Sequence, residues 1–265
     1  MHPYLINLNN FKMPTYGFMI AMAYITATLY ILKKSRKENL NKESITDIVF
    51  YTVLSGIIGG KILYIITFWQ YFGNDLNEKI KNIFTFDTLT SGFVFYGGFM
   101  TAIISLYILT RIKNIKFLKL ADIMSPAAAL AHAIGRIGCF SAGCCHGKPT
   151  QSIFGVIFSN PQSLVKREYL NIPIHPTQLY ESFGNVLIFL FLNFILSKKY
   201  FKKDGYVFML YIILYSFLRF IVELYRGDER GITYLNLSQA QFISILAITA
   251  SISGIIYIKK NNYGK

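Results

Sequence analysis

The chain contains few charged residues for its length. Asp, Glu, Lys and Arg make up 15% of its 265 residues, whereas 53% of the residues are hydrophobic. A soluble domain normally carries about a quarter charged residues, so this composition excludes an ordinary soluble enzyme and indicates a membrane protein. Only 13 residues are acidic against 27 basic ones, which gives a formal charge of +14. The basic residues form short runs between apolar segments, a distribution that encodes membrane topology and argues against a nucleic-acid-binding protein.

Two features of secreted and transport proteins are also missing. Residues 1–11 lack a basic stretch followed by an apolar run and a cleavage site, so we expect no removable signal peptide. The chain has no internal repeat and no matching pair of interrupted spans in its two halves, as many secondary transporters have. Both absences favour a membrane enzyme over an exported protein or a transporter.

Seven apolar runs approach or exceed the length of about 17–25 residues that a membrane-spanning helix needs. The fourth run is the least regular, because Pro126 and several glycines interrupt it. We expect an all-α, polytopic membrane protein that forms a single integral membrane domain over residues 1–265. The predicted spans are 15–33, 46–69, 92–110, 118–140, 177–197, 205–225 and 236–258.

The basic residues also predict the orientation of these spans. Basic clusters follow the first, third, fifth and seventh spans, whereas the loops 71–91, 141–176 and 226–235 are poorer in basic residues for their length. The positive-inside rule then places the N-terminus outside and the C-terminus in the cytoplasm. With this topology, nearly all of the unusual polar and glycine residues singled out below fall in the outer half of the bilayer. Residues that only pack helices would be scattered over all depths, so we predict a site that faces the outer leaflet.

Two arginines lie inside predicted spans. A guanidinium stays charged, and its placement at membrane depth costs ~2.5–3.5 kcal/mol even on the lenient insertion scale. Arg136 and Arg219 therefore need an anion or a wet cavity, and the planar fork of arginine suits a lipid phosphate. Glu223 either orients Arg219 for a ligand or forms a salt bridge that lets two charges enter the membrane, and both can hold at once. Spacings of four, four and three residues place four side chains on one helix face: Tyr215, Arg219, Glu223 and Arg226.

Polar and glycine-rich residues mark the outer ends of two further spans. Gly97 and Gly98 follow Tyr96 at the start of the third span. Their backbone could hold a headgroup, or their small size could allow close helix packing. Gln178 and Glu181 are three residues apart and share a face of the fifth span. A buried carboxylate at position 181 needs a cation, which one of the basic residues within the spans would supply.

The cysteines do not follow the spacing of a zinc site. A zinc signature usually has one pair of ligands two to four residues apart and a second, distant pair, and adjacent cysteines strain that geometry. We therefore favour small packing residues in a tight outer loop over a metal site or a thiol nucleophile, and expect no metal. An oxidising outer face would also permit a disulfide. The eight-residue cluster contains Cys139, Cys144, Cys145 and His146. His132, within the fourth span, is interpreted as a hydrogen-bonded interior residue.

In this order, the motifs resemble the prolipoprotein diacylglyceryl transferase family over almost the whole chain. The resemblance implies a bacterial plasma (inner) membrane enzyme. Such an enzyme moves the diacylglyceryl group of phosphatidylglycerol to the lipobox cysteine of a prolipoprotein signal peptide, and releases glycerol 1-phosphate. It implies no metal or organic cofactor, because the phospholipid is a co-substrate. The matching blocks are Tyr16-Gly17, Gly60-Lys61, Gly97-Gly98, Gly135 to Gly138 with Gly147, His175 to Glu181, and Arg219 to Arg226.

The resemblance also implies roles for individual residues. Arg136 and Arg219 would hold the phosphate, with Glu223 and Arg226 supporting them. Two tyrosines, at positions 16 and 215, would position the headgroup. The predicted catalytic residues are Arg136, Arg219, Tyr96 and Glu223, and the predicted substrate-binding residues are Tyr16, Lys61, Gly97, Gly98, Gly147, Gln178, Glu181, Tyr215 and Arg226.

The chain departs from the family pattern at three notable positions. Tyr96 stands where many members carry a histidine, and a tyrosine is a poor base near neutral pH but a good hydrogen-bond donor. Cys139 replaces an asparagine, and Cys144 replaces an acidic residue. Either the histidine is dispensable, or the chain is a paralogous membrane transferase with the same phosphate-holding core and a different acceptor. A lipid-binding or transport protein with an arginine anion site is the third interpretation.

Overall fold

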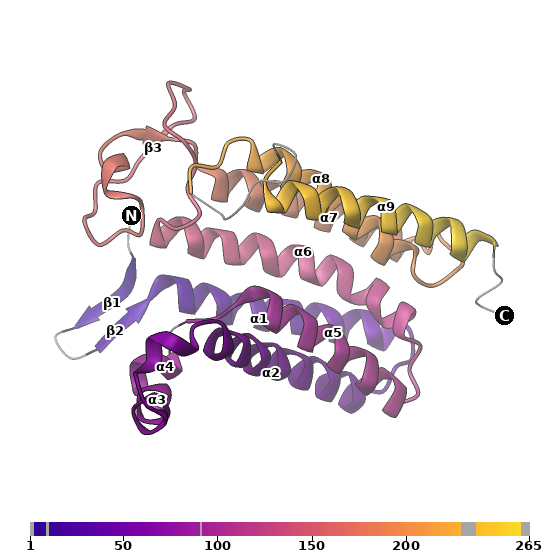
Figure 1. The fold of residues 1–265 in the computed structure, drawn as a ribbon. Coiled ribbons are helices and arrows are strands. Elements are labelled where there is room, and N and C mark those ends of the chain that lie inside the picture. Colours follow the sequence, from indigo (N-terminus) through magenta and orange to yellow (C-terminus); the bar gives the residue numbers. More distant parts are fainter. Residues whose placement is uncertain (1–2, 9–10, 91, 229–236, 261–265) are drawn as a thin grey trace. The chain divides into compact units, whose positions relative to one another are not determined.

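The protein is described by a computed structural model, which covers residues 3–8, 11–90, 92–228 and 237–260 (Figure 1). Among these residues, seven helices are long and apolar enough to cross a membrane. Each coincides with one predicted span, which confirms the all-α, polytopic prediction, while the orientation of the termini stays a prediction. The helices are α1 (Thr15–Lys37), α2 (Lys42–Thr67), α5 (Phe95–Ile112), α6 (Phe117–Ala142), α7 (Thr177–Ser197), α8 (Tyr206–Glu223) and α9 (Gln239–Lys260).

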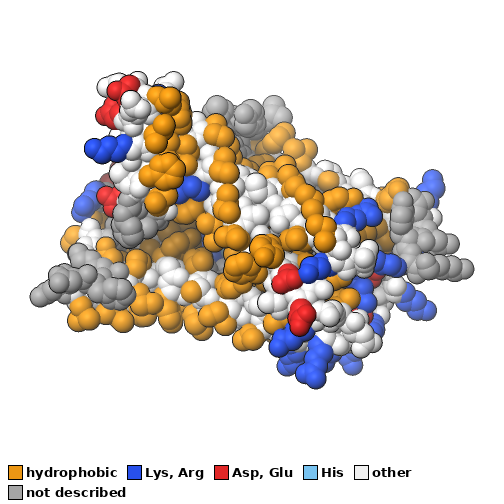
Figure 2. Space-filling view, turned by 90° about the horizontal axis from the view of Figure 1, so that it is seen from below, with side chains coloured by type: hydrophobic (Ala, Val, Ile, Leu, Met, Phe, Trp, Pro, Cys, Tyr) orange, Lys and Arg blue, Asp and Glu red, His pale blue; other side chains and the backbone are white. Residues whose placement is uncertain are grey.

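Apolar side chains cover much of the surface of these helices. Figure 2 shows hydrophobic side chains over much of the visible surface. Ile58 of α2 and Ile104 of α5 are each at least half exposed, at 50% and 53%. A helix that is hydrophobic on its outer face as well as its inner one is typical of a membrane span.

Pro126 does not interrupt α6, which continues from Phe117 to Ala142. Proline is tolerated within membrane helices because neighbouring groups satisfy the backbone that it leaves unpaired. The irregular fourth run is therefore a complete helix.

The chain divides into two compact units. The large unit consists of Met1–Lys34 and Leu118–Lys265, and the small unit of Ser35–Phe117. In the large unit, α6, α7 and α8 share a core of buried apolar side chains, so these three helices hold one another in place. The core residues are Ala129, Ile188, Leu192, Ile195 and Val207.

A buried carboxylate at one end of α6 caps α8. Asp122 accepts hydrogen bonds from the backbone amides of Gly205 at 2.7 Å and Phe208 at 2.8 Å. The first amides of a helix have no partner within the helix, so a side chain that accepts from them stabilises its start. Sequence analysis did not single out Asp122, because its partners lie more than 80 residues away.

In the small unit, α2 and α5 pack through glycines. A Cβ atom added to Gly97 would lie 2.5 Å from the carbonyl oxygen of Gly59, and one added to Gly98 would lie 2.7 Å from that of Gly56. Thr101 ties the same helices together, since its hydroxyl donates to the Ser55 carbonyl at 2.9 Å. These contacts support the packing interpretation of the glycine pair.

Replacing Gly97 with alanine is therefore expected to lower the free energy of unfolding by about 1–3 kcal/mol, the usual cost of an overpacked site. Gly17→Ala in α1 is the matched control, because its added Cβ would meet nothing within 4 Å. That variant should be neutral or more stable by up to about 1 kcal/mol. Thermal unfolding in detergent micelles measures both, and equal stabilities would contradict the tight contact at Gly97.

Short elements occupy the connections that were expected to be loops. These elements have no extended hydrophobic periodicity, and several are only two to five residues long, so they could not be predicted from the sequence pattern. They are the antiparallel pair β1 (Tyr4–Leu8) and β2 (Phe11–Pro14), η1 (Trp69–Phe72), α3 (Leu76–Ile83), α4 (Phe86–Thr90), η2 (Arg167–Tyr169), and the antiparallel pair β3 (Val156–Ile157) and β4 (Pro173–Ile174).

The connection between α6 and α7 has a small core of its own. Phe158, Val165 and Ile174 are buried in it, and Phe140 at the end of α6 packs against them. This core anchors the connection to the end of the helices, next to the cysteines.

Candidate functional site

A buried ion pair joins α6 to α7. Glu181 is fully buried, and Arg136 donates from Nη2 to its Oε1 at 2.8 Å. His132 lies one turn before Arg136. Its Nε2 accepts from Arg136 Nε at 3.1 Å and lies 3.2 Å from the same carboxylate oxygen. Arg136 is thus the cation that sequence analysis required for Glu181, and His132 is the hydrogen-bonded interior residue that was expected.

A second buried ion pair lies within α8. Arg219 Nη2 is 2.5 Å from Glu223 Oε2, and the two side chains are only 9% and 7% exposed. Among the described residues, however, Arg219 Nη1 is buried and has no hydrogen-bond partner. A buried donor without a partner is costly, so this nitrogen is suited to receive an acceptor from a ligand. The salt-bridge interpretation and the ligand interpretation of Arg219 therefore both hold.

Tyr215 connects the two ion pairs. Its ring centroid lies 5.0 Å from that of His132, and its side chain lies within electrostatic range of Glu181, Arg136 and Arg219. The Glu181 carboxylate lies within electrostatic range of both Arg136 and Arg219. The two arginines that stood far apart in the sequence consequently belong to one cluster, built at the same end of α6, α7 and α8.

Arg226 lies beyond the end of α8, and its predicted role in substrate binding stays a prediction. The prediction of a continuous helix face up to this residue is wrong, because α8 ends at Glu223 and the chain turns there. Arg226 forms a bidentate ion pair with Asp228: Nε donates to Oδ1 at 2.8 Å, and Nη2 donates to Oδ2 at 2.6 Å. Burial lowers the pKa of Arg226, but Asp228 outweighs it, so the pKa lies above its ordinary value. Nε and Nη2 therefore hold the turn after α8, whereas Nη1 is buried without a hydrogen-bond partner among the described residues.

Gly147 is required by backbone packing. Its amide donates to the His175 carbonyl at 3.0 Å, and the next residue, Lys148, donates to the Tyr225 carbonyl at 2.9 Å. A Cβ atom at position 147 would lie 2.5 Å from that His175 oxygen and 2.8 Å from that Tyr225 oxygen. Only glycine fits where these three segments meet, so its position holds the turn after α8 in place.

The start of α7 is fastened to the cysteine loop. Gln178 donates from Nε2 to the Cys144 carbonyl at 2.7 Å, and the Thr177 hydroxyl donates to the Cys145 carbonyl at 2.8 Å. Gln178 Oε1 is buried without a hydrogen-bond partner among the described residues. Gln178 thus combines a structural bond with one unused acceptor beside the loop.

The three cysteines lie together at the end of α6. Their sulfur atoms are all within 4.8 Å of one another, and each is a thiol. Hydrogen bonds with Cys139 and Cys144 lower the pKa of the Cys145 thiol, and the neighbouring Arg136 and Arg226 lower it further. The predicted tight loop is confirmed, and its cysteines form a single cluster.

Tyr16 reaches the same region from the start of α1. A Cβ atom on Gly138 of α6 would lie 2.9 Å from Met19 Cβ and 3.4 Å from Tyr16 Cα, so this glycine lets α1 approach α6 closely. The Tyr16 side chain is 44% exposed and lies within electrostatic range of Arg136 and the cysteines. A hydroxyl in this position can meet the headgroup of a lipid.

Four predicted site residues belong to the small unit. Lys61 donates from Nζ to the carbonyl oxygens of Thr88 and Gly92, the latter at 3.2 Å, and lies 4.7 Å from the Phe93 ring centroid. Tyr96 is about half exposed, and its ring packs against that of Phe95. Gly97 and Gly98 are in the α2–α5 contact described above. A role for any of these four in substrate binding or catalysis stays a prediction.

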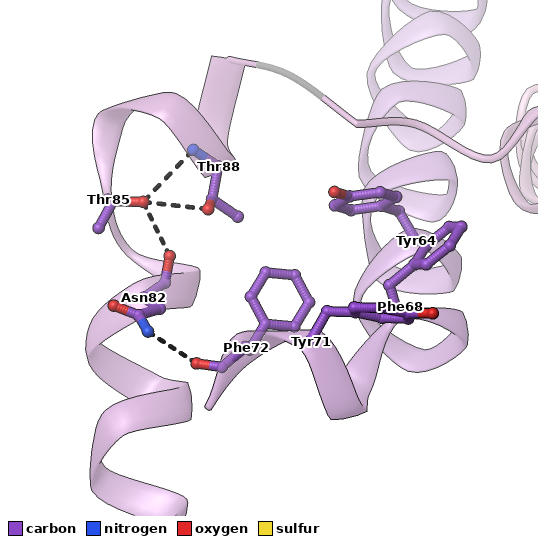
Figure 3. Close-up of a pocket in the computed structure, with 7 residues that line it drawn as sticks. All are labelled: Tyr64, Phe68, Tyr71, Phe72, Asn82, Thr85 and Thr88. Atoms are coloured by element: carbon purple, nitrogen blue, oxygen red, sulfur yellow. Dashed lines mark hydrogen bonds between the residues drawn. The ribbon is translucent and has the colours of Figure 1, made fainter. Parts of the chain in front are cut away.

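Lys61 also stands beside a cavity of about 590 Å³ in the small unit. Its Nζ is 5.3 Å from the ring centroid of Tyr64, which lines this cavity, and it bonds the carbonyl of Thr88, another lining residue. Figure 3 shows aromatic rings on one side and a hydrogen-bonded trio on the other. The lining residues are Tyr64, Phe68, Tyr71, Phe72, Asn82, Thr85 and Thr88.

Sequence analysis missed two polar residues of α7. Ser182 donates to the Ala133 carbonyl of α6 at 2.8 Å, and Asn185 donates from Nδ2 to the Glu181 carbonyl at 2.8 Å. Both are buried, and they extend the polar stripe of α7 by one turn. The signal was present, since Asn185 follows Glu181 by four residues in an otherwise apolar run.

Comparison with known proteins gives consistent matches over nearly the whole chain. The family model for prolipoprotein diacylglyceryl transferase matches residues 3–257. A phosphatidylglycerol–prolipoprotein diacylglyceryl transferase of Clostridium tetani (strain Massachusetts / E88) is 40% identical over 252 residues, covering 95% of this chain and 96% of the relative. A transferase numbered 2 under the same name, from Clostridium perfringens (strain 13 / Type A), is 38% identical, covering 91% and 89%. A relative of that name from Listeria innocua serovar 6a (strain ATCC BAA-680 / CLIP 11262) is 34% identical, covering 97% and 90%.

Proposed function

Because this chain belongs to the prolipoprotein diacylglyceryl transferase family, we propose that it transfers the diacylglyceryl group of phosphatidylglycerol to the lipobox cysteine of a prolipoprotein. The products are a thioether-linked lipid and glycerol 1-phosphate. The chain is a multi-pass membrane protein, and the proposal places it in the bacterial plasma membrane with its site toward the outer leaflet. This reaction is the first step of lipoprotein maturation.

In the proposed reaction, the sulfur of the substrate cysteine attacks a glyceryl carbon. A carbon–sulfur bond forms, the carbon–oxygen bond to the phosphate breaks, and the phosphate leaves with the electron pair. The thiol proton must leave as well, because the thiolate is the nucleophile. Cations that meet the departing phosphate stabilise the transition state, a contribution often worth 10²–10³-fold in rate per donor.

The observation that carries this proposal concerns Nη1 of Arg219, which is buried and has no hydrogen-bond partner among the described residues. The Arg219 side chain lies within electrostatic range of Glu181, the ion-pair partner of Arg136. Around it, three arginines face three carboxylates, so the formal charges balance. Balanced charge lets the guanidinium groups sit at membrane depth at a tolerable cost. A lipid phosphate would then bind where an arginine donor is still unused. The six residues are Arg136, Arg219, Arg226, Glu181, Glu223 and Asp228.

The proposed chemistry uses no metal and no organic cofactor. Phosphatidylglycerol supplies the transferred group and the leaving group, and no electron is exchanged with a further reagent. The chain's own residues bind the phosphate, hold the headgroup and accept or relay one proton.

The test is a transfer assay in proteoliposomes that contain phosphatidylglycerol labelled in its acyl chains. Native protein should attach the label to a peptide with a lipobox cysteine, and not to the same peptide with serine at that position. Arg136→Ala should reduce the labelling strongly. Loss of labelled lipid without labelled peptide would instead favour a paralogous transferase with another acceptor, and lipid movement without chemical change would favour a transporter.

Tyr96 offers a separate prediction about the departure from the family pattern. If its hydroxyl donates a hydrogen bond to the substrate, Tyr96→Phe should lower the rate of transfer about tenfold, as expected for the loss of one such bond. Tyr96→His should retain activity, since many family members carry histidine there. Phe95→Leu, at the exposed neighbouring ring, is the control. A fully active Tyr96→Phe variant would show that the hydroxyl has no donor role.

A further inference from the structure

The cysteine cluster is a preformed arrangement of three sulfur ligands. Cys139 comes from the last turn of α6, while Cys144 and Cys145 come from the loop that follows. The backbone turns back at Gly143, with φ of +81°, and again at Cys145, with φ of +60°. These two left-handed residues bring the adjacent cysteines over the helix end, so all three sulfur atoms lie within 4.8 Å of one another. Adjacent cysteines were expected to fit a metal site poorly, and the two left-handed backbone turns bring their side chains together all the same.

Bonds from other segments hold the loop in this shape. The carbonyls of Cys144 and Cys145 accept from Gln178 and Thr177 of α7, at 2.7 and 2.8 Å. The Leu164 amide donates to the Ala142 carbonyl at 2.9 Å. The sulfur positions therefore depend on the folded protein as well as on the spacing of the cysteines.

The neighbouring histidine is engaged elsewhere. His146 is buried, with Nδ1 3.1 Å from the Gly147 carbonyl oxygen, and its Nε2 accepts from the Lys166 amide at 3.4 Å. Both ring nitrogens have partners, so the cluster offers three sulfurs and no imidazole. Structural zinc sites are almost always four-coordinate, whereas soft thiolate ligands select monovalent copper.

From this geometry we propose that Cys139, Cys144 and Cys145 form a three-coordinate site for a soft monovalent metal ion of the copper(I) class. Three sulfur–hydrogen bonds break, three metal–sulfur bonds form and three protons are released, with no change of oxidation state. The resulting site carries two negative charges, and two guanidinium groups lie close to it, those of Arg136 and Arg226. The ion is not a reactant in lipid transfer.

The test is a titration of the reduced full-length protein in detergent micelles with copper(I) held by a chromophoric chelator. Native protein should bind one ion per chain, and X-ray absorption should show a shell of three sulfurs. Cys139→Ser and Cys145→Ser should each weaken binding at least tenfold, whereas Ser141→Ala, an exposed position in the same segment, should not. Two separate cysteine variants guard against one that fails to fold.

A synthetic peptide of residues 135–149 is the second control. It contains all three cysteines without the bonds from α7, so the folded protein should bind copper(I) at least about tenfold more tightly than the peptide. Equal affinity for the peptide, unchanged binding by either cysteine variant, or a disulfide among the cysteines in protein isolated from intact cells would overturn the proposal. Because the readout is metal binding, its failure leaves the transfer reaction untouched.

Discussion

Replacing Arg219 with glutamine is expected to lower the rate of diacylglyceryl transfer by about 10²–10³-fold, the usual effect of removing a charged donor to a developing anion. The variant loses the buried Nη1 that has no partner among the described residues. It also leaves Glu223 without the guanidinium that lies 2.5 Å away. Initial rates with labelled phosphatidylglycerol and a lipobox peptide measure the effect.

A double variant separates this loss from a loss of stability. In Arg219→Gln with Glu223→Gln, no charge is left unpaired, so the protein should fold like the native chain and stay inactive. Glu223→Gln alone keeps the arginine charge and should retain activity to within about tenfold, since only its orientation is relaxed. Arg111→Gln is the control that should change nothing, because Arg111 belongs to the small unit and donates to the Tyr107 hydroxyl at 3.0 Å. Native rates in the double variant would mean that Arg219 binds no substrate.

Replacing Glu181 with alanine is expected to lower the free energy of unfolding by about 3–5 kcal/mol, the cost of leaving a buried charge without its partner. Glu181 is fully buried, and its loss strands Arg136, which is only 13% exposed. Transfer should be lost as well, because Arg136 would lose the carboxylate that fixes its side chain. Chemical unfolding in micelles and the transfer assay measure the two effects.

Two comparisons define how this result is interpreted. Glu168→Ala removes an exposed carboxylate that lies 3.8 Å from Lys166, and it should leave stability unchanged, as for most surface pairs. Glu181→Leu combined with Arg136→Met replaces the buried pair with apolar side chains, which should restore most of the stability but no activity. If the single Glu181→Ala variant were as stable as the native protein, the pair would not carry the helix contact proposed here.

The helices could be predicted because each one is encoded locally. A run of about 20 apolar residues can only span a bilayer as a helix, since no water is present to satisfy its backbone. The arginines were predicted as site residues because they are charged within an apolar run, and that role stays a prediction. The resemblance to the family added the reaction, and the relatives matched over most of the chain agree with it.

The partners of these residues could not be predicted in the same way. Arg136 was one of several cations available to Glu181, and the bond joins residues 45 positions apart. Arg226 was expected to share a helix face with Arg219, but α8 ends at Glu223, and Arg226 Nε and Nη2 donate to Asp228. From the sequence, Gly97 could either hold a headgroup or allow close helix packing. In the structure, a Cβ atom on Gly97 would lie 2.5 Å from the Gly59 carbonyl oxygen, which supports packing.

By itself, the amino-acid sequence determined that this protein is a membrane protein of seven helices with arginine charge buried at one end. Hydropathy and charge act over one turn or one span, so they can be recognised without knowing the neighbours. Only the tertiary structure decided that Glu181 forms its ion pair with Arg136 and that the three cysteine sulfurs lie within 4.8 Å of one another. It also decided that Arg219 Nη1 has no hydrogen-bond partner among the described residues. Those outcomes depend on which helix ends meet, and on backbone turns such as the one at Cys145 that no local pattern encodes.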